Sequence, residues 1–295
     1  MSRKTVVALG EFDGVHIGHR AVLREAMLYA FRCGAEPVVY TFENHPSEVI
    51  GTPVKLIYPP EVKRSLLSGL GIEPVFEKFT AELAALAPRD FVDSIFTRFD
   101  PECLVCGYDY TFGRGAQGNV ELLKKLCADS GRDCVAVDSV ELLGKPVSST
   151  RIRAAIAAGD FKTANSLLGR EYGYTGSVTP NRHIGTSIGF PTVNITVPSE
   201  LVAPQKGVYA ARLIIDGSEL PCAAYYGDRP TVNGTQAFLE GHSLVPLPPL
   251  YGTTIELRLL RYIRPEVAFS SAQELRAQIE RDTQRIQEYF DEIPE

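Results

Sequence analysis

The sequence predicts an α/β protein with two domains. The first is built on a parallel β-sheet, and the second is a smaller antiparallel β-barrel that ends in a helix. The chain has 295 residues, of which 44% are apolar, and this length favours two domains over one. Short β-branched segments alternate with helical ones up to about residue 138, whereas strands with no helices between them follow residue 169.

The first 138 residues carry the alternation that is typical of strand–helix–strand units around a parallel sheet. A helical stretch from 151 to 168 then precedes Gly169. We expect strands at 6–9, 37–40, 103–106 and 135–137, and helices at 19–31, 60–69, 89–99 and 120–130.

The remaining residues predict a small antiparallel barrel or sandwich. Apolar runs at 207–215, 220–226, 236–239 and 254–260 are separated by Gly, Pro, Asn and Asp turns. The segment 271–290 repeats apolar residues at helical spacing and predicts one amphipathic helix packed on the barrel, through Leu275, Ile279, Ile286 and Phe290. The composition changes between Gly169 and Gly176, so we expect domains at 1–170 and 171–295.

Charge and composition exclude several classes of protein. The formal charge of −6 provides no general attraction for nucleic acid or anionic lipid. The first apolar stretch, which ends at Gly10, is shorter than the core of a signal peptide and has no small-residue cleavage site, so we expect a first strand there. No apolar run reaches the roughly 20 residues of a membrane-spanning helix. We therefore expect a soluble, cytoplasmic protein without nucleic-acid or membrane partners.

The six cysteines are too few for a disulfide framework in a chain of this length. Cys103 and Cys106 have metal-like spacing, but they lie in an apolar run that reads as a strand. Residues three apart in a strand point to opposite faces, so they cannot chelate one ion. We expect both to be buried apolar residues.

The segment from Gly10 to His19 predicts a phosphate site, because it follows the first strand and opens the first helix. His16 and His19 would share one helix face, and Gly18 between them removes a side chain that would block a nucleotide. Taken alone, a histidine pair at this spacing is more often structural than catalytic. Strand, glycines and histidines together favour catalysis.

This segment resembles the His-x-Gly-His signature of nucleotidylyltransferases. Its fuller form, Gly-x-Phe-Asp-Gly-Val-His-x-Gly-His, is similar to that of the bacterial bifunctional riboflavin kinase/FMN adenylyltransferases. Segments 41–46, 107–113 and 147–153 look like further motifs of that family in the expected order. The resemblance implies a Rossmann-like domain that binds ATP and FMN. Glu11 stands where the family often has Asn, and its carboxylate would repel a triphosphate unless Mg²⁺ or geometry shields it.

Adenylyl transfer needs positioning and charge stabilisation rather than a protein nucleophile. The resemblance implies catalysis by His16, His19, Arg151 and Arg153, with Mg²⁺. Asp109 and Phe112 would shape the flavin side. The hydroxyls at 148–150 also suit a helix cap, and one residue can serve both roles. Nucleotide or flavin binding is implied for Gly10, Phe12, Asp13, Gly14, Gly18, Asn44, His45, Pro46, Asp109, Phe112, Ser148, Ser149 and Thr150.

Two other signatures do not hold. Residues 113–118 spell G-x-G-x-x-G, but five residues, 108–112, separate them from the end of the apolar run 103–107, whereas a dinucleotide fingerprint needs the turn directly after the strand. His16 to His19 also spell the class I aminoacyl-tRNA synthetase signature. Those enzymes also need a Lys-Met-Ser-Lys-Ser loop, and methionine occurs here only at positions 1 and 27.

In the second domain, Thr192 and Asn194 place two hard oxygens on one strand face, which suits Mg²⁺. By itself the segment also reads as a Pro-Thr turn that enters a strand. Gly-Phe-Pro-Thr-x-Asn is similar to the riboflavin kinase signature, and the likeness continues at 207–209, 227–231, 240–242, 250–252 and 264–269.

The likeness implies that Thr192 and Asn194 hold Mg–ATP and that Glu240 is the general base. It also implies substrate contacts by Gly185, Gly189, Pro191 and Arg229. Several positions depart from the family. Acidic residues are common there at the positions of Val245, Leu247 and Pro249, and Gly and Arg at those of Asn181 and Thr186.

The resemblance implies phosphorylation of riboflavin to FMN, and adenylylation of FMN to FAD with release of pyrophosphate. Riboflavin, FMN and ATP would be the small-molecule substrates. Two alternatives stay open: an FMN adenylyltransferase whose barrel is a non-catalytic flavin-binding module, and an adenylyltransferase for another phosphorylated substrate. The sequence leaves the oligomeric state open.

Overall fold

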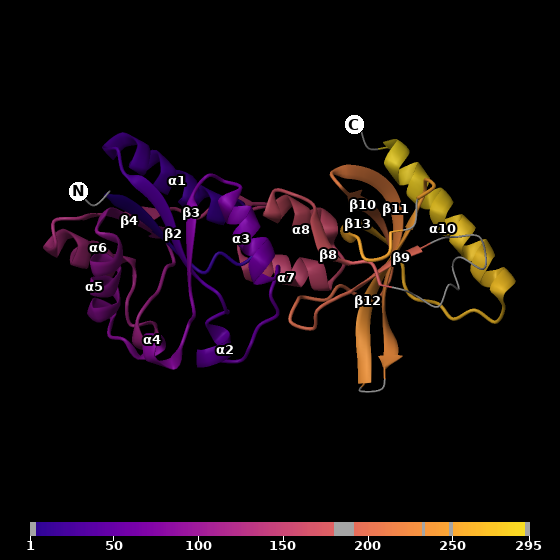
Figure 1. The fold of residues 1–295 in the computed structure, drawn as a ribbon, viewed down its shortest axis with the longest axis horizontal. Helices are drawn as coiled ribbons and strands as arrows, with labels where there is room; N and C mark the ends of the chain where they lie inside the picture. Colours follow the sequence, from indigo (N-terminus) through magenta and orange to yellow (C-terminus); the bar gives the residue numbers. More distant parts are fainter. Residues whose placement is uncertain (1–3, 180–191, 232–233, 248–249, 293–295) are drawn as a thin grey trace. The chain divides into compact units, whose positions relative to one another are not determined.

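The structure is a computed structural model that describes residues 4–179, 192–231, 234–247 and 250–292 (Figure 1). The chain divides into two compact units, Met1–Ser149 and Thr150–Glu295. The boundary that the sequence predicts near residue 170 stays a prediction. Among the described residues, no helix is long and apolar enough to cross a membrane.

The first unit contains a five-stranded parallel sheet in the order β3-β2-β1-β4-β5. Because the strand order reverses between β1 and β4, the chain leaves these two neighbouring strands toward opposite sides of the sheet. Ligands of such sheets bind at this reversal, outside the carboxyl ends of the strands. The strands are β1 (Thr5–Leu9), β2 (Glu36–Phe42), β3 (Glu73–Glu77), β4 (Pro101–Gly107) and β5 (Asp133–Val137).

Helices of the first unit cover both faces of this sheet (Figure 1). One face carries α1 and α3 and the other α5 and α6, so the sheet lies between two apolar clusters. The helices are α1 (Ile17–Cys33), α2 (Ser47–Ile50), α3 (Pro60–Ser68), α4 (Ala81–Ala85), α5 (Pro88–Phe99) and α6 (Val120–Asp129), with a 3-10 turn, η1 (Arg114–Ala116), and a hairpin of β6 (Glu141–Leu142) and β7 (Lys145–Pro146).

The two spaced cysteines are buried on opposite faces of the sheet, as the strand period predicts. Cys103 belongs to the cluster beneath α1, and Cys106 to the cluster beneath α5 and α6. Burial raises the pKa of the Cys103 thiol to about 12, so the thiol stays protonated at neutral pH. The described residues contain no group of three or more His, Cys, Asp or Glu side chains that could hold a metal ion.

The second unit contains a six-stranded antiparallel sheet in the order β8-β13-β10-β11-β12-β9. The sheet curls so that its two edge strands, β8 and β9, meet. Just after β8, the Thr179 N–H donates to the Asn194 carbonyl of β9 over 2.9 Å. Gly176 of β8 lies against Ile195 of β9. The strands are β8 (Tyr172–Ser177), β9 (Thr192–Thr196), β10 (Gly207–Ile215), β11 (Ser218–Thr231), β12 (Gly234–Ser243) and β13 (Thr254–Arg264).

The predicted helical stretch 151–168 is two helices rather than one, α7 (Ser149–Ala157) and α8 (Phe161–Leu168). Gly159 has a φ of 71°, which ends the first helix, and the Asp160 side chain accepts the Thr163 N–H and caps the second. The long amphipathic helix predicted at the C-terminus is present as α10 (Ala272–Glu292).

Helix α10 packs on β10 and β11, where Ile286 is fully buried against Val208 and Ala210 (Figure 1). A nearly buried ion pair holds the helix in place. Arg264 at the end of β13 reaches both carboxylate oxygens of Asp282, over 2.7 to 3.0 Å, and Asp282 is only 3% exposed. Breaking such a pair leaves a buried charge without its counterion.

We expect Asp282→Ala to lower the free energy of unfolding of the second unit by about 3–5 kcal/mol, because Arg264 keeps its charge without a partner. Urea unfolding followed by tyrosine fluorescence measures this, since the chain has no tryptophan. Glu280→Ala is the matched control: its pair with Arg276 is exposed, so the loss should stay below about 1 kcal/mol. Equal losses in both variants would contradict the analysis.

Candidate nucleotide and flavin sites

The turn between β1 and α1 lies at the sheet's reversal point and has an unusual backbone. Phe12 and Val15 have φ of 57° and 40°, although neither is glycine, and Gly14 between them has φ of 84°. The Val15 N–H donates to the Phe12 carbonyl over 3.0 Å and closes the turn. Both non-glycine side chains are buried, so packing holds a backbone conformation that L-residues rarely adopt.

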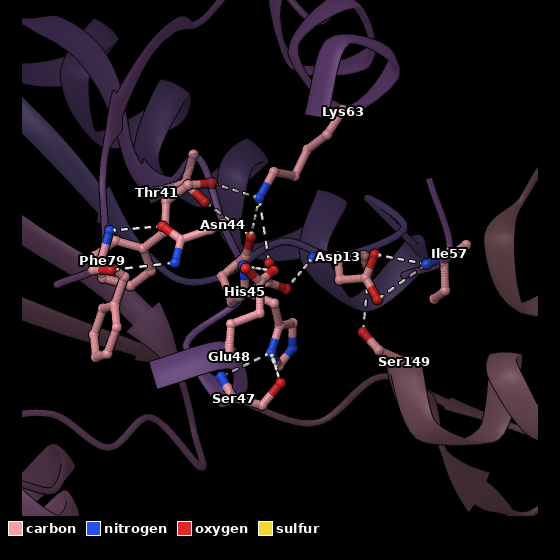
Figure 2. Close-up of polar contacts among 12 residues, drawn as sticks. Asp13, Thr41, Asn44, His45, Ser47, Glu48, Ile57, Lys63, Phe79 and Ser149 are labelled. Carbon is pink, nitrogen blue, oxygen red and sulfur yellow. Dashed lines mark hydrogen bonds and ion pairs between the residues drawn. The ribbon is translucent and has the colours of Figure 1, made fainter. Parts of the chain in front are cut away.

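Asp13 anchors this turn. Its carboxylate accepts the backbone N–H of Ile57 over 3.0 Å, and the Ser149 hydroxyl donates to its carbonyl over 2.9 Å (Figure 2). Asp13 is 2% exposed. The sequence assigned Asp13 and Ser149 to nucleotide binding, and the structure places both in the support of the turn.

The two histidines of the motif share one face at the start of α1, as their spacing predicts. Their rings stack with centroids 3.5 Å apart and planes at 15°. His16 is the N-cap of α1, and its Nδ1 accepts the His19 N–H over 3.1 Å. Since Nδ1 accepts, the proton of a neutral His16 ring lies on Nε2, which is therefore a donor.

The glycines of the motif make room for its rings. A Cβ at Gly18 would lie 3.2 Å from the His16 ring, and a Cβ at Gly10 would lie 2.9 Å from the Phe12 ring. The Phe12 ring in turn meets His19 edge to face at 5.3 Å. Gly10 and Gly18 therefore permit the arrangement of the histidines, in addition to the open approach expected from the sequence.

Glu11 is paired with a lysine that the sequence reasoning missed. Lys63 of α3 is 5% exposed, and its Nζ lies 3.2 Å from Glu11 Oε1, 3.2 Å from the Glu11 carbonyl and 2.8 Å from the Phe42 carbonyl. The other Glu11 oxygen, Oε2, accepts the Asp13 N–H over 2.7 Å. Lys63 thus supplies the shielding that the Glu11 carboxylate needs beside a triphosphate. Its only sequence signal is its place one turn before the buried Leu67 on α3.

A small hollow beside this pair is lined by Glu11, Asp13, Glu43, His45, Tyr58 and Lys63, among others. His45 Nδ1 accepts the Ser47 N–H over 3.1 Å, and Pro46 is the N-cap residue of α2 (Figure 2).

Asn44, which the sequence assigned to nucleotide binding, uses its side chain within the fold. Its amide nitrogen donates to the Phe79 carbonyl over 3.1 Å, and its oxygen accepts the Phe79 N–H over 2.9 Å (Figure 2). These two bonds join the segment after β2 to the segment after β3.

The segment after β4 shows why the glycines at 113–118 do not form a dinucleotide fingerprint. β4 ends at Gly107, and Phe112 pairs with Gly118 through two backbone hydrogen bonds of 2.9 and 3.1 Å. A Cβ at Gly118 would lie 2.6 Å from the Phe112 ring. Phe112 is buried in the core, whereas Asp109 is exposed just after the strand. The buried Phe112 ring would therefore affect a flavin site only by packing against the residues that line it.

The last motif of the first site crosses the boundary between the units. Ser148 and Ser149 close the first unit, and Ser149 begins α7. Thr150, Arg151 and Arg153 belong to the second unit, where Thr150 is exposed and both arginines are half-buried in α7.

In the second unit, three side chains of the predicted kinase site lie on one sheet face. Glu240 of β12 is directly opposite Asn194 of β9, and His242 is opposite Thr192. Directly opposite residues of antiparallel strands project to the same side. On the other side of Glu240, its cross-strand neighbour is Tyr225 of β11, which donates to the Glu266 carboxylate.

The oxygens of Thr192 and Asn194 fit a hard divalent cation. Asn194 is 1% exposed, its Nδ2 lies 3.5 Å from Thr192 Oγ1, and its buried Oδ1 has no hydrogen-bond partner among the residues that the structure describes. A buried acceptor without a donor costs free energy unless a ligand satisfies it. Mg²⁺, which prefers such oxygens, would satisfy it.

Other residues assigned to the kinase site are in part outside the described region. Gly185, Gly189 and Pro191 lie there, as do the departing positions Asn181, Thr186 and Pro249. Arg229 is described: its guanidinium donates to the Gln236 side chain over 3.2 Å and lies over the Phe238 ring at 5.6 Å. The Arg229 guanidinium therefore contacts two side chains of the neighbouring strand β12.

Comparison with known proteins assigns one family to each part of the chain. The family model of FAD synthetase matches residues 1–151, and that of riboflavin kinase matches residues 168–290. A solved structure described as a macrolide-efflux protein from Streptococcus pneumoniae is 29% identical with a TM-score of 0.89, and the match covers 97% of this chain and 95% of that one.

Curated relatives match over nearly the whole length. A bifunctional riboflavin kinase/FMN adenylyltransferase of Listeria monocytogenes is 35% identical over 97% of this chain and 92% of its own. The protein of the same description from Escherichia coli is also 35% identical, over 97% of this chain and 92% of its own. The chain therefore belongs to the family of bifunctional riboflavin kinase/FMN adenylyltransferases.

Proposed function

We propose that this protein phosphorylates riboflavin to FMN in its second unit and adenylylates FMN to FAD in its first, with ATP as co-substrate of both reactions. The observation that carries the proposal is the presence of two separate constellations in one chain. The stacked pair of His16 and His19 lies at the reversal of the parallel sheet, and the row of Asn194 and Glu240 crosses the antiparallel sheet.

In adenylyl transfer, an oxygen of the FMN phosphate attacks the α-phosphorus of ATP, and the bond from that phosphorus to the bridging oxygen breaks as pyrophosphate leaves. The protein has to orient the two phosphates and stabilise the charge that develops on their oxygens. His16 donates from Nε2 because its Nδ1 already accepts the His19 N–H. His19, stacked on it, is held beside the same charge. For Arg151 and Arg153 we keep the role that the family motif implies, which is stabilisation of the leaving group.

In the kinase reaction, the terminal hydroxyl of the riboflavin ribityl chain attacks the γ-phosphorus of ATP, and ADP leaves. Glu240 accepts the hydroxyl proton, since a positioned carboxylate is a competent base for an alcohol nucleophile. Mg²⁺, held by Thr192 and Asn194, would neutralise charge on the ATP phosphates when bound. The strand register supports this division of roles, because Glu240 is directly opposite Asn194, and Thr192 lies two residues from Asn194 on the same strand.

One incubation tests the whole proposal. The protein is supplied with riboflavin, ATP and Mg²⁺, and the flavins are separated by chromatography; FMN and FAD should both form. FAD only from supplied FMN would favour the alternative in which the barrel is a non-catalytic flavin-binding module. No flavin product at all would favour another phosphorylated substrate. The cytoplasmic location and the lack of nucleic-acid and membrane partners stay predictions from the sequence.

We expect His16→Ala and His19→Ala each to lower the rate of FAD formation from supplied FMN by about 10²–10³, because one donor to the developing charge is lost. Formation of FMN from riboflavin should remain, since its residues lie in the other unit. Arg24→Ala, on the exposed side of α1, is the matched control and should keep both activities. Parallel loss of both activities in the histidine variants would contradict two independent sites.

We expect Glu240→Gln to lower kcat for FMN formation by about 10²–10⁴ and to leave KM for ATP nearly unchanged, because the amide keeps the size of the side chain and loses the base. Steady-state kinetics with riboflavin measures both constants, and FAD formation from supplied FMN serves as the control. Near-normal turnover, with chemistry as the slow step, would rule out Glu240 as the base.

A further inference from the structure

Lys63 is a buried cation whose hydrogen-bonding capacity is used up within the protein. An ammonium group has three N–H donors. Those of Lys63 have three acceptors, the Phe42 carbonyl, the Glu11 carbonyl and the Glu11 carboxylate, at 2.8, 3.2 and 3.2 Å (Figure 2). No donor is left for a substrate phosphate, so Lys63 acts on a bound anion through its charge and through the groups that it holds in place, not through a hydrogen bond of its own.

Glu11 connects this lysine to the turn that carries the histidines. Its Oε1 faces Lys63, and its Oε2 accepts the Asp13 N–H inside the turn. The Thr41 hydroxyl donates to the Glu11 carbonyl over 2.8 Å, which ties the same residue to β2. The Glu11 side chain is 24% exposed and lines the pocket beside the turn, whereas that of Lys63 is 7% exposed.

Glu11 and Lys63 contribute opposite charges to this pocket, which Asp13 and Glu43 also line. A lone carboxylate at the edge of a phosphate site weakens anion affinity, by about tenfold for one charge roughly 10 Å away at an effective dielectric of 20. Lys63, 3.2 Å from that carboxylate, cancels most of the repulsion. The pair is therefore neutral as a whole, and the loss of either partner leaves a net charge of opposite sign at the same place.

We propose that Lys63 is a positioning residue of the adenylyl-transfer site: it neutralises Glu11 and ties the β1–α1 turn to α3 and β2, so that the triphosphate of ATP is accepted beside the Glu11 carboxylate. This inference rests on the proposed function of the first unit. It makes Glu11 and Lys63 a matched pair whose single charges, each left alone, shift the affinity for ATP in opposite directions.

The test compares the two single variants and their double variant with the wild type. The measured quantity is KM for ATP during FAD formation from supplied FMN. Lys63→Met should raise KM about tenfold, because the carboxylate is then unbalanced, and Glu11→Gln should lower KM severalfold, because the cation is then unbalanced. The double variant should return to within about threefold of the wild type, and Lys63→Arg should keep most of the affinity. A merely structural role would raise KM or lower kcat in both single variants without recovery in the double variant, and that result would overturn the proposal.

Folding is controlled within the same experiment. FMN formation from riboflavin, which depends on the second unit, should stay unchanged in every variant, and thermal unfolding reports the state of the first unit. If Lys63→Met unfolds that unit, the direction of the Glu11→Gln effect still decides, since a KM equal to or above the wild-type value refutes the proposal. Lys124→Met is the matched control: it removes a lysine paired with Glu121 on the exposed side of α6 and should leave KM for ATP unchanged.

Calorimetric titration of the full chain with ATP and Mg²⁺, without flavin, separates this inference from the proposed function. The component of the first unit is identified as the one that remains when Asn194→Ala removes the Mg–ATP site proposed for the second unit. If that component is present but no FAD forms, the proposed function fails. The inference is then tested by the affinity for ATP alone, which should fall in Lys63→Met and rise in Glu11→Gln. If FAD forms and the affinities of the single variants equal the wild-type value, the inference fails alone. If no such component exists, both fail.

Discussion

The turn between β1 and α1 holds Phe12 and Val15 at positive φ, and the arrangement of the first site depends on this constraint. Each such residue costs about 1–3 kcal/mol, so the turn persists only where surrounding contacts over-determine it. The turn ends at His16, whose ring caps α1 and stacks on His19. A relaxed turn would displace the cap and with it both imidazoles.

The contacts that hold the turn come from distant parts of the sequence. Thr41, Ile57 and Lys63 bond to Glu11 or Asp13 across 30, 44 and 52 residues, and Ser149 bonds to Asp13 across 136. Local propensity therefore does not form this site. It forms when the fold brings the ends of β1 and β2, the region of α3 and Ser149, the first residue of α7, to one place. For this reason, several residues of the sequence motifs use their side chains to hold the segments around the site in place.

In the second unit, the register between two antiparallel strands positions the candidate residues. Antiparallel pairing of β9 with β12 sets Asn194 against Glu240, so two residues 46 positions apart face the same space without any strained turn. The closure of the sheet by the Thr179 bond to the Asn194 carbonyl fixes the same strand. Both reactions of the family use ATP, and FMN, the product of one, is a substrate of the other. Separate frameworks allow each phosphate geometry to be set independently.

The sequence by itself determined the fold class, the positions of both motifs along the chain and the face that His16 and His19 share. The reason is that the periods of strands and helices follow from the local spacing of apolar and polar side chains. It did not resolve β3 (73–77) or β8 (172–177), whose glutamates and glycines obscure a period of two, nor the break at Gly159. Only the tertiary structure decided that Asn44 and Asp13 bond to backbone groups and that Lys63 is buried against Glu11. Polar partners depend on which segments meet in space, and a chain carries no local signal for a contact made 30 or more residues away.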